Sequence, residues 1–394
     1  MKKDSYIYLS IFIVVLIGGI LLMKFIPNSS LKRKINSLPT AADTEENTNM
    51  VFSENGIFKT YYKLATNHIK NLSLDEKIGQ LLLIKYSPTD TKVFNYNPSG
   101  FIFYEDDFSE KTKVDVIKMI SDIQKKGKIP YLMAVDEEGG NVIRVSSNNK
   151  LVDEPYKSPS YIYNHGGIDA IKEDTNIKNK ELASLGLNVN LAPVVDVSLD
   201  NTSYIYERTL KENADKVSEY ARSVITSSKN TGVSDVLKHF PGYGDNTDTH
   251  TTKPIDDKEY NDIKNDYLSP FEAGIDAGAE AVLVNHITYT NIDDTNPSSL
   301  SKPTIKLLRD TLNFTGVVIS DDLSMGAVND IDNVYSKAIK AGNDIIIVSD
   351  YIEAIKDIKK ALIDEELTEE EITDHAARVL AWKYYKGLMN TTTK

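Results

Sequence analysis

The chain has 394 residues, of which 41% are hydrophobic and 26% are charged, so it is long enough to form a large folded core. Its net charge of −13 and pI near 5.1 argue against a nucleic-acid partner, because such a partner requires a basic surface to offset phosphate charge. The absence of cysteine excludes disulfides, thiolate metal sites and cysteine nucleophiles.

An uncharged apolar stretch near the start of the chain predicts a membrane anchor. Residues 5–23 carry no charge, and a helix of nineteen residues spans roughly 28 Å, close to the thickness of the hydrocarbon core of a bilayer. The stretch is long for a signal peptide and lacks a small-residue cleavage site, which favours an uncleaved transmembrane helix over residues 5–24. Basic residues flank both sides, so charge alone does not indicate its orientation. The polar residues 27–50 predict a flexible tether to a folded domain over residues 51–394.

Beyond the tether, short apolar runs alternate with amphipathic helical stretches, the pattern of a parallel sheet covered by helices. Eight runs are predicted as strands: 79–86, 99–104, 130–136, 187–193, 234–240, 280–287, 316–322 and 344–350. Eight strand–helix units in about 340 residues predict a single α/β domain, a (β/α)8 barrel of the TIM type. Residues 367–388 predict a last helix on the outside of the barrel.

Polar and ionisable residues gather at the carboxyl ends of the predicted strands. They are Asp136, Asp196, Lys238, His239, Asn285, His286, Asp321 and Asp322. In a barrel of this type, strand ends and the loops after them build the active site. Ordinary polar loops do not explain Lys–His and Asn–His pairs still within strand ends, so the pattern predicts an active site there.

The segment 237–250, LKHFPGYGDNTDTH, concentrates ionisable and turn-forming residues. Pro241 and two glycines predict a sharp turn directly after the strand. Asp248 lies two residues before His250, close enough to orient its imidazole and stabilise the charged form. His250 is therefore a candidate proton donor and acceptor. The simpler alternative is a hydrogen-bonded loop histidine without a catalytic role.

The same segment also permits a metal interpretation. Asp245, Asp248 and His250 are candidate ligands for a divalent ion, and His286 is a candidate fourth ligand. Their spacing matches none of the standard zinc or calcium loops, so no metal site is predicted.

A candidate nucleophile follows the apolar strand near residue 320. Asp321 and Asp322 are adjacent, and neighbouring residues of a strand face opposite sides, so only one of them faces the site. Displacement at an acetal carbon requires one carboxylate that attacks and one group that protonates the leaving oxygen. Asp321 is the candidate for the first role, with His250 in the second. Asp322 is a candidate N-cap for a following helix.

The segment AVDEEGGNVIRV is the third candidate element. Asp136 lies at a strand end, where its carboxylate is a candidate acceptor for sugar hydroxyls. For Glu137 and Glu138 three roles stay open, namely solvation, pairing with Arg144, or contact with a ligand. Arg208, in YERTL, is open between a substrate contact and a surface salt bridge.

Together these stretches resemble glycoside hydrolase family 3, and within it the bacterial β-N-acetylglucosaminidases that act on cell-wall fragments. Eight motifs occur in the family's order across about residues 75–350: EKIGQLLL, VDEEGGNVIR, NLAPVVDV, YERTL, LKHFPGYGDNTDTH, LVNHITY, PSSLS and VVISDDLSMGAV. The Asp248-Thr249-His250 sequence is the most discriminating, because it is similar to the acid/base dyad of the N-acetylglucosaminidase branch.

The resemblance implies a retaining mechanism through a covalent glycosyl-enzyme, without a cofactor. Asp321 would be the nucleophile, and His250, assisted by Asp248, the acid/base. The side chains implied to hold the non-reducing GlcNAc are Asp136, Arg208, Lys238 and His239, with Asn285 and His286 near the same pocket. The implied substrate is a GlcNAc-containing muropeptide, which would suit a catalytic domain held outside the cell membrane by a single span.

The chain departs from the family's pattern at three positions. Tyr243 stands where many relatives have His, Glu137 where Gln is common, and Asn141 where Arg often occurs. None of these changes removes a residue with an implied catalytic role. The alternatives are a β-glucosidase or β-xylosidase, an N-acetylglucosaminide phosphorylase, and an inactive membrane-tethered sugar-binding barrel. The sequence indicates no oligomeric state.

Overall fold

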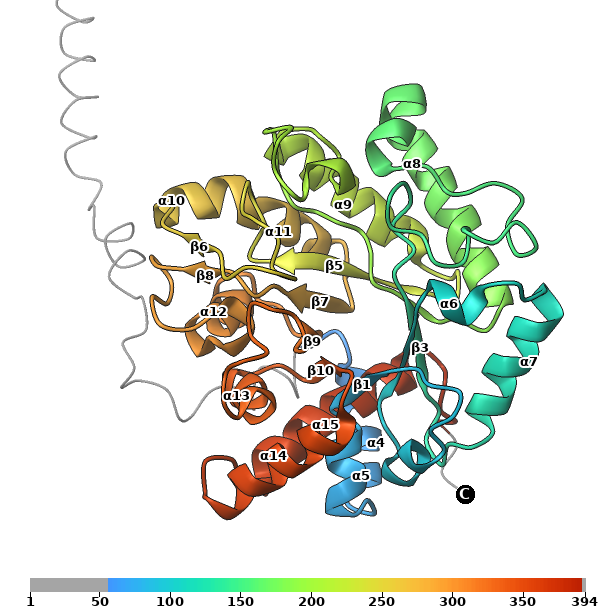
Figure 1. Cartoon of the computed structure of the whole chain (residues 1–394), viewed down its shortest axis with the longest axis vertical. Helices are drawn as coiled ribbons and strands as arrows, with labels where there is room; N and C mark the ends of the chain where they lie inside the picture. Colours follow the sequence, from blue (N-terminus) through green and yellow to red (C-terminus); the bar gives the residue numbers. More distant parts are fainter. Residues whose placement is uncertain (1–55, 392–394) are drawn as a thin grey trace, which may run out of the picture. The chain divides into compact units, whose positions relative to one another are not determined.

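The computed structural model describes residues 56–391, in which eight parallel strands close into a barrel (Figure 1). The strands are β1 (Leu82–Lys85), β2 (Gly100–Phe103), β3 (Leu132–Val135), β4 (Val189–Asn190), β5 (Ser234–Phe240), β7 (Ala281–Val284), β9 (Val317–Asp322) and β10 (Ile345–Val348). Around the barrel they follow the order β1–β10–β9–β7–β5–β4–β3–β2, so neighbours in the barrel are consecutive barrel strands along the chain, except for the first and last strands, β1 and β10, which close it. All eight predicted strands are present, and the predicted barrel is confirmed.

The predicted anchor over residues 5–24 and tether over residues 27–50 lie outside the described residues. Across residues 56–391, no helix combines the length and the apolar composition that a membrane span requires. The anchor and the tether therefore stay predictions.

Helices surround the barrel (Figure 1). The α-helices are α4 (Lys59–Ile69), α5 (Leu74–Gly79), α6 (Glu105–Phe108), α7 (Lys113–Gln124), α8 (Pro159–Ser184), α9 (Ala214–Ser228), α10 (Tyr260–Asp262), α11 (Ser269–Asp276), α12 (Lys302–Lys306), α13 (Val334–Ala341), α14 (Tyr351–Ile363) and α15 (Glu369–Tyr385). Shorter helical turns are η1 (Lys92–Tyr96), η2 (Tyr206–Arg208), η3 (Ile263–Leu268), η4 (Ser298–Leu300) and η5 (Leu307–Thr311). Helices α5, α7 and α15 each begin with a Ser or Thr whose side chain caps the first turn, while an acidic residue three positions later binds back to the cap.

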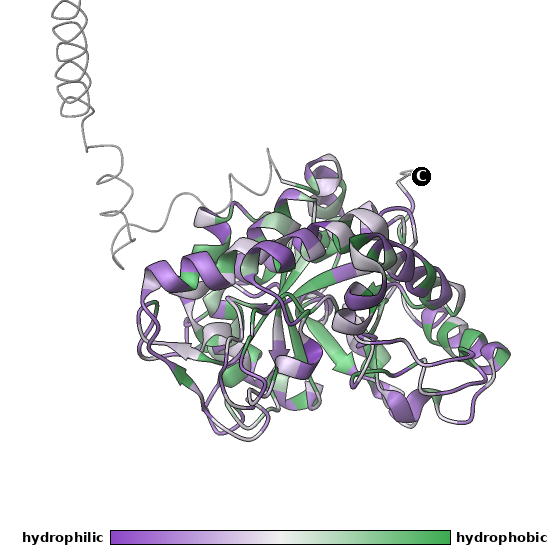
Figure 2. Ribbon diagram, turned by 90° about the horizontal axis from the view of Figure 1, so that it is seen from above, coloured by the Kyte–Doolittle hydropathy of each residue, from purple (hydrophilic) through white to green (hydrophobic). Residues whose placement is uncertain are grey.

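The strands are apolar on both faces because each packs between the barrel interior and the surrounding helices. Figure 2 shows the strands mostly in the hydrophobic colour and much of the helical surface in the hydrophilic colour. Every position of β2, β3, β7 and β10 is buried. At Gly100 in β2, a Cβ atom would lie 2.0 Å from the carbonyl oxygen of Leu132, so only glycine fits there. Continuous apolar runs were therefore the correct signal for these strands.

The ladder is irregular near the candidate residues. Lys238 pairs with Leu283 but Phe240 with Val284, so the register shifts at His239. Such a bulge re-aims side chains, which brings both Lys238 and His239 into the site although adjacent strand residues normally face opposite sides. Strand β4 is shorter than the predicted 187–193, and an isolated bridge between Val194 and Lys238 continues its pairing with β5.

Two further features extend the barrel. Strands β6 (Ile255–Asp256) and β8 (Thr288–Tyr289) form a small parallel sheet that joins the loop after β5 to the loop after β7. Helix α15 packs against α4, with the rings of Phe58 and Tyr385 5.4 Å apart. The predicted last helix on the outside of the barrel is thus confirmed.

Candidate active site

Two cations and two carboxylates form a buried network at the carboxyl ends of β3 and β5. Lys238 Nζ lies 2.7 Å from Asp136 Oδ1 and 2.6 Å from Glu138 Oε1. Arg208, in η2, binds Glu138 with two nitrogens, at 2.9 and 2.8 Å. We call these four residues the gripping network. Arg208 therefore lies in the site, and the alternative of a surface salt bridge is wrong.

Burial and ion pairing shift the pKa values of the gripping network in opposite directions. Burial alone would raise the pKa of the Glu138 carboxyl, but Arg208 and Lys238 outweigh it, so the pKa lies well below its ordinary value. Burial likewise works against the charge of Arg208, and Glu138 overcomes it, which raises the pKa of the guanidinium. The side chains of Glu138, Arg208 and Lys238 therefore stay charged. Bidentate and short contacts hold them in a fixed geometry.

The acidic pair after β3 is not solvated, so that alternative is wrong. Glu137 and Glu138 are 0% and 3% exposed. Glu137 accepts hydrogen bonds from the backbone N–H groups of Arg144 and Val145, at 2.8 and 2.6 Å, and from Ser146. It therefore closes the loop after β3, and its contact with Arg144 is to the backbone rather than the guanidinium. Glu138, in contrast, is the central anion of the gripping network.

His239 joins the gripping network to a buried carboxylate. Its Nδ1 lies 2.6 Å from Asp196 Oδ2, and its Nε2 lies 3.2 Å from Arg208 Nη2. Because Arg208 can only donate, the tautomer with the proton on Nδ1 satisfies both contacts. Asp196 also accepts from the backbone N–H of His239, at 3.2 Å, and this fixes the ring.

Asp321 lies at the end of β9 and is partly buried. Burial alone would raise the pKa of its carboxyl, but the imidazoles of His286 and His239 and the N–H of Asp322 outweigh this effect and lower it. An ionised carboxylate at a strand end fits the nucleophile role. Asp322 instead accepts from the N–H of Ser324, at 2.9 Å, and closes a turn; no helix starts there, so its predicted role as a helix cap is wrong.

Asn285 and His286 lie beside the site as supports. His286 Nδ1 lies 2.7 Å from Ser299 Oγ, and its Nε2 lies 3.0 Å from the carbonyl oxygen of Asp322. The Asn285 amide donates to the carbonyl oxygen of His239 at 3.1 Å. Both residues are at most 1% exposed, so their side chains brace the ends of β5 and β9. A direct contact of either with substrate stays a prediction.

The predicted dyad is formed on the other side of the site. Asp248 Oδ1 lies 2.7 Å from His250 Nδ1 and accepts the backbone N–H of His250 at 2.9 Å. The His250 side chain is 56% exposed, and its hydrogen bonds to other side chains within residues 56–391 are made through Nδ1 rather than Nε2. We call residues 243–252 the acid/base loop. Its Asp–His pair can hold a proton on Nε2 and stabilise the imidazolium.

Two backbone bonds place the acid/base loop against the segment that follows Asp321. Gly326 N donates to His250 O and Ala327 N donates to Thr249 O, both at 3.0 Å. The approach is close, because a Cβ at Gly326 would lie 2.5 Å from His250 O. His250 and Asp321 both act on the pKa of the His286 imidazole, which burial lowers. The dyad is thus docked against the segment that follows the candidate nucleophile.

Two tyrosines near the site were missed from the sequence, and Arg144 was considered only as a partner of Glu137 and Glu138. The Tyr204 hydroxyl lies 3.3 Å from His250 Nδ1. The Arg144 guanidinium lies 5.9 Å from the ring centre of Tyr104, and its buried Nε has no hydrogen-bond partner in the described part of the chain. Burial raises the pKa of the Tyr104 phenol, and so do Asp136 and Asp321, which places this ring near the site. A tyrosine in a chain with 22 of them gives no sequence signal by itself.

The residues of the metal interpretation are not brought together. Asp245 accepts from Ser198 at 2.7 Å, away from the Asp248–His250 contact. Within residues 56–391, no three His, Asp or Glu side chains are arranged to hold a metal ion.

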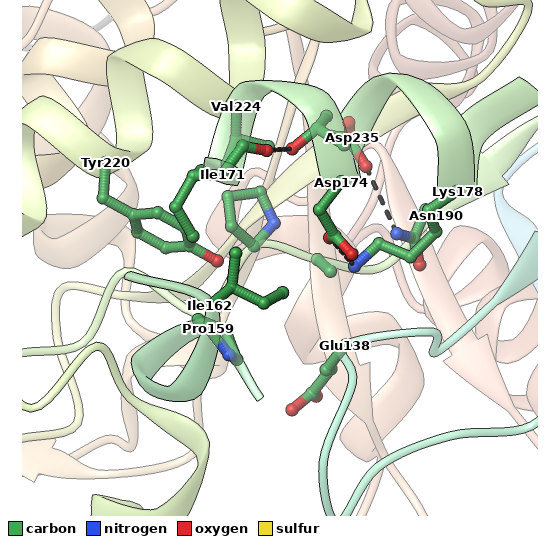
Figure 3. Close-up of a pocket in the computed structure, with 13 residues that line it drawn as sticks. Glu138, Pro159, Ile162, Ile171, Asp174, Lys178, Asn190, Tyr220, Val224 and Asp235 are labelled. Carbon is green, nitrogen blue, oxygen red and sulfur yellow. Dashed lines mark hydrogen bonds and ion pairs between the residues drawn. The ribbon is translucent and has the colours of Figure 1, made fainter. Parts of the chain in front are cut away.

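A small cavity is lined by residues of α8, α9, β4 and β5 and by Glu138 (Figure 3). Its volume of about 20 Å³ has room for a single water molecule. Asp235 of β5 lines it and accepts from Asn179 at 2.7 Å and from Asn190 at 3.3 Å. Burial raises the pKa of Asp235 to about 7. Glu138 of the gripping network lines this cavity, which is too small to hold a sugar.

Comparisons with known proteins identify the family of the chain. Residues 73–382 match the model of the glycosyl hydrolase family 3 N terminal domain. The chain is 28% identical over 258 residues to a beta-hexosaminidase of Xylella fastidiosa, covering 64% of this chain and 76% of that protein. It is 32% identical over 289 residues to beta-hexosaminidase A of Pseudoalteromonas piscicida, covering 66% of this chain but only 48% of that longer protein.

A solved structure shows the same architecture. A glycoside hydrolase family 3 beta-N-acetylglucosaminidase from Paenibacillus aligns with a TM-score of 0.75 and 26% identity, covering 82% of this chain and 64% of that one. The family match spans most of the chain and includes the gripping network, the dyad and Asp321. The chain is therefore a glycoside hydrolase and belongs to glycoside hydrolase family 3.

Proposed function

We propose that this protein is a retaining exo-β-N-acetylglucosaminidase. The observation that carries the proposal is the Asp248–His250 dyad, docked against the segment that follows the partly buried Asp321. The names of the beta-hexosaminidase relatives and of the Paenibacillus beta-N-acetylglucosaminidase support N-acetylglucosamine as the sugar.

In the first step, a carboxylate oxygen of Asp321 attacks the anomeric carbon while the bond to the leaving-group oxygen breaks. His250 gives the proton on Nε2 to that oxygen, and Asp248 stabilises the imidazole through Nδ1. In the second step, His250 takes a proton from water, whose oxygen attacks the anomeric carbon and releases Asp321. Each step forms one bond to the anomeric carbon and breaks one on the opposite face, which inverts its configuration. Two inversions together retain the configuration.

The gripping network would hold the non-reducing sugar. Asp136 is partly exposed and has one oxygen on Lys238, so its carboxylate can also accept sugar hydroxyls. Lys238, Arg208 and His239 are held by Glu138 and Asp196 before any sugar arrives. Preorganised polar groups of this kind stabilise a transition state without a cost of reorganisation at the moment of reaction.

We also propose that the natural substrates are muropeptides with terminal GlcNAc, cleaved by a catalytic domain held outside the cell membrane. The apolar residues 5–23 support an anchor, and a cell-wall substrate gives such an anchor a function.

The test is hydrolysis of 4-nitrophenyl N-acetyl-β-glucosaminide by the full chain and its Asp321→Asn variant. Because a neutral amide cannot form the glycosyl ester, we expect a loss of about three or more orders of magnitude. The matched control is Asp322→Asn, which keeps an acceptor for Ser324 and should stay within about tenfold of wild type. Near-normal activity of Asp321→Asn would exclude the nucleophile, and a first-formed α-anomer would exclude retention.

A further inference from the structure

Tyr243 is buried beneath the acid/base loop, and its hydroxyl contacts both sides of Asp248. The hydroxyl oxygen accepts the backbone N–H of Thr249 at 2.9 Å and donates to the carbonyl oxygen of Thr247 at 3.1 Å. Thr249 Oγ1 lies 3.1 Å away as a third partner. A phenol has one donor and two acceptor positions, so these contacts use its full capacity. Burial raises the pKa of this phenol, which keeps the donor proton in place.

The other end of Tyr243 is fixed to the sugar side of the site. Its backbone N–H donates to Asp196 Oδ1 at 2.7 Å, and the same carboxylate orients His239. The ring centre lies 5.7 Å from that of His239 and 5.8 Å from that of Tyr204. Tyr243 is only 1% exposed, so packing restricts its ring to this position.

We propose that Tyr243 is a positioning residue that holds the Asp248–His250 dyad in its catalytic position, an inference that rests on the proposed function. Thr249 is the residue between the two members of the dyad, and it is the one that Tyr243 holds. Asp248 is partly exposed and His250 is exposed, so little packing orders them directly. Besides Tyr243, the described contacts that dock this turn are the backbone bonds from Gly326 and Ala327 and the Tyr204 hydroxyl, 3.3 Å from His250 Nδ1. Loss of the hydroxyl should therefore let the turn move away from Asp321.

A displaced dyad affects a specific part of the reaction. Protonation matters most when the leaving oxygen is basic and little when the leaving group is a good one. The gripping network does not contact the Tyr243 hydroxyl, so sugar binding should change little. A positioning role therefore predicts a defect that depends on the leaving group, whereas a merely structural role predicts an equal loss for all substrates.

The experiment compares Tyr243→Phe with Tyr267→Phe in the full chain. Tyr267 packs beneath the same loop, against Gly242 and Gly244, but its hydroxyl reaches Asp256 at 3.4 Å and not residues 247–249. We expect Tyr243→Phe to lower kcat/KM about 10- to 100-fold for methyl N-acetyl-β-glucosaminide but less than about threefold for the 4-nitrophenyl substrate. Tyr267→Phe should change neither by more than about threefold.

A second arm places Tyr243→Phe in a His250→Ala background. Because Tyr243 acts through His250, the added substitution should cause no further loss of kcat/KM. An equal loss on both substrates, or the same loss in the His250→Ala background as in wild type, would overturn the inference. A wild-type chain without activity on either substrate would contradict the proposed function instead. If Tyr243→Phe does not fold, Thr249→Val removes the third contact of the hydroxyl, with Thr249 Oγ1, and should show the same dependence on the leaving group with a smaller loss.

Discussion

Glu138 on one side of the site has a side chain that is 2% exposed and binds two cations, whereas the His250 side chain on the other side is 56% exposed and has one carboxylate partner. The sugar side is thus built from charges that would be costly to leave unpaired. The leaving-group side rests on a few backbone bonds and a tyrosine hydroxyl. This difference would suit the proposed reaction, in which the same sugar binds in every turnover while leaving groups enter and depart past His250.

The largest effect is expected from Glu138→Gln, which removes the anion between Lys238 and Arg208. Two buried cations would lose their shared partner, and breaking a buried ion pair costs about 3–5 kcal/mol of folding free energy. The same change should lower kcat/KM by at least about 10³-fold, since in the proposed function the cations also orient the sugar. Urea unfolding and steady-state kinetics measure the two effects.

The matched control is Glu207→Gln, which removes the ion pair between Glu207 and Lys211. The Glu207 side chain is 61% exposed. A surface pair contributes about 1 kcal/mol or less, so stability should change little. Equal destabilisation by both changes would contradict the rigid, charge-held description of the sugar side.

His250→Ala should show the opposite profile, with activity lost and stability kept. General acid–base catalysis contributes about 10²–10⁴-fold, so a substrate with a poor leaving group should lose activity in that range. Because the side chain is exposed, the free energy of unfolding should change by about 0.5 kcal/mol or less. Steady-state kinetics and urea unfolding of the same preparation test both parts. A large loss of stability would show that the acid/base loop belongs to the folded core.

The barrel and its catalytic edge were predictable because both depend on local signals. Each strand is a short apolar run, and polar residues such as Asp136, Lys238 and Asp321 mark where a run ends. The Asp248–His250 contact was predictable because two residues in one turn have little freedom to be apart.

Pairing across strands was not predictable from one sequence. Glu138 meets Arg208 and Lys238, which are 70 and 100 residues later, and no spacing rule joins them. The orientations of Asn285 and His286 were also beyond reach, because the identity of a strand-end residue does not show whether its side chain faces the substrate or braces a neighbouring strand.

The smallest expected effect concerns the cavity that Glu138 lines, where Asp235 is the buried acid. Its pKa of about 7, raised by burial, means that the folded chain keeps a proton that the unfolded chain releases near its ordinary value of 3.8. Its contribution to stability is therefore favourable at low pH and is lost as pH rises from about 4 to 7. Asp235→Asn cannot ionise, and the unpaired Oδ1 of Asn179 offers its new amide an acceptor. Relative to wild type, the variant should gain about 2–3 kcal/mol of unfolding free energy between pH 5 and pH 8. Urea unfolding at both pH values measures this change. A difference between the variant and wild type that stays constant with pH would mean that Asp235 is already ionised at pH 5. The sugar side would then tolerate a further buried charge without a cationic partner.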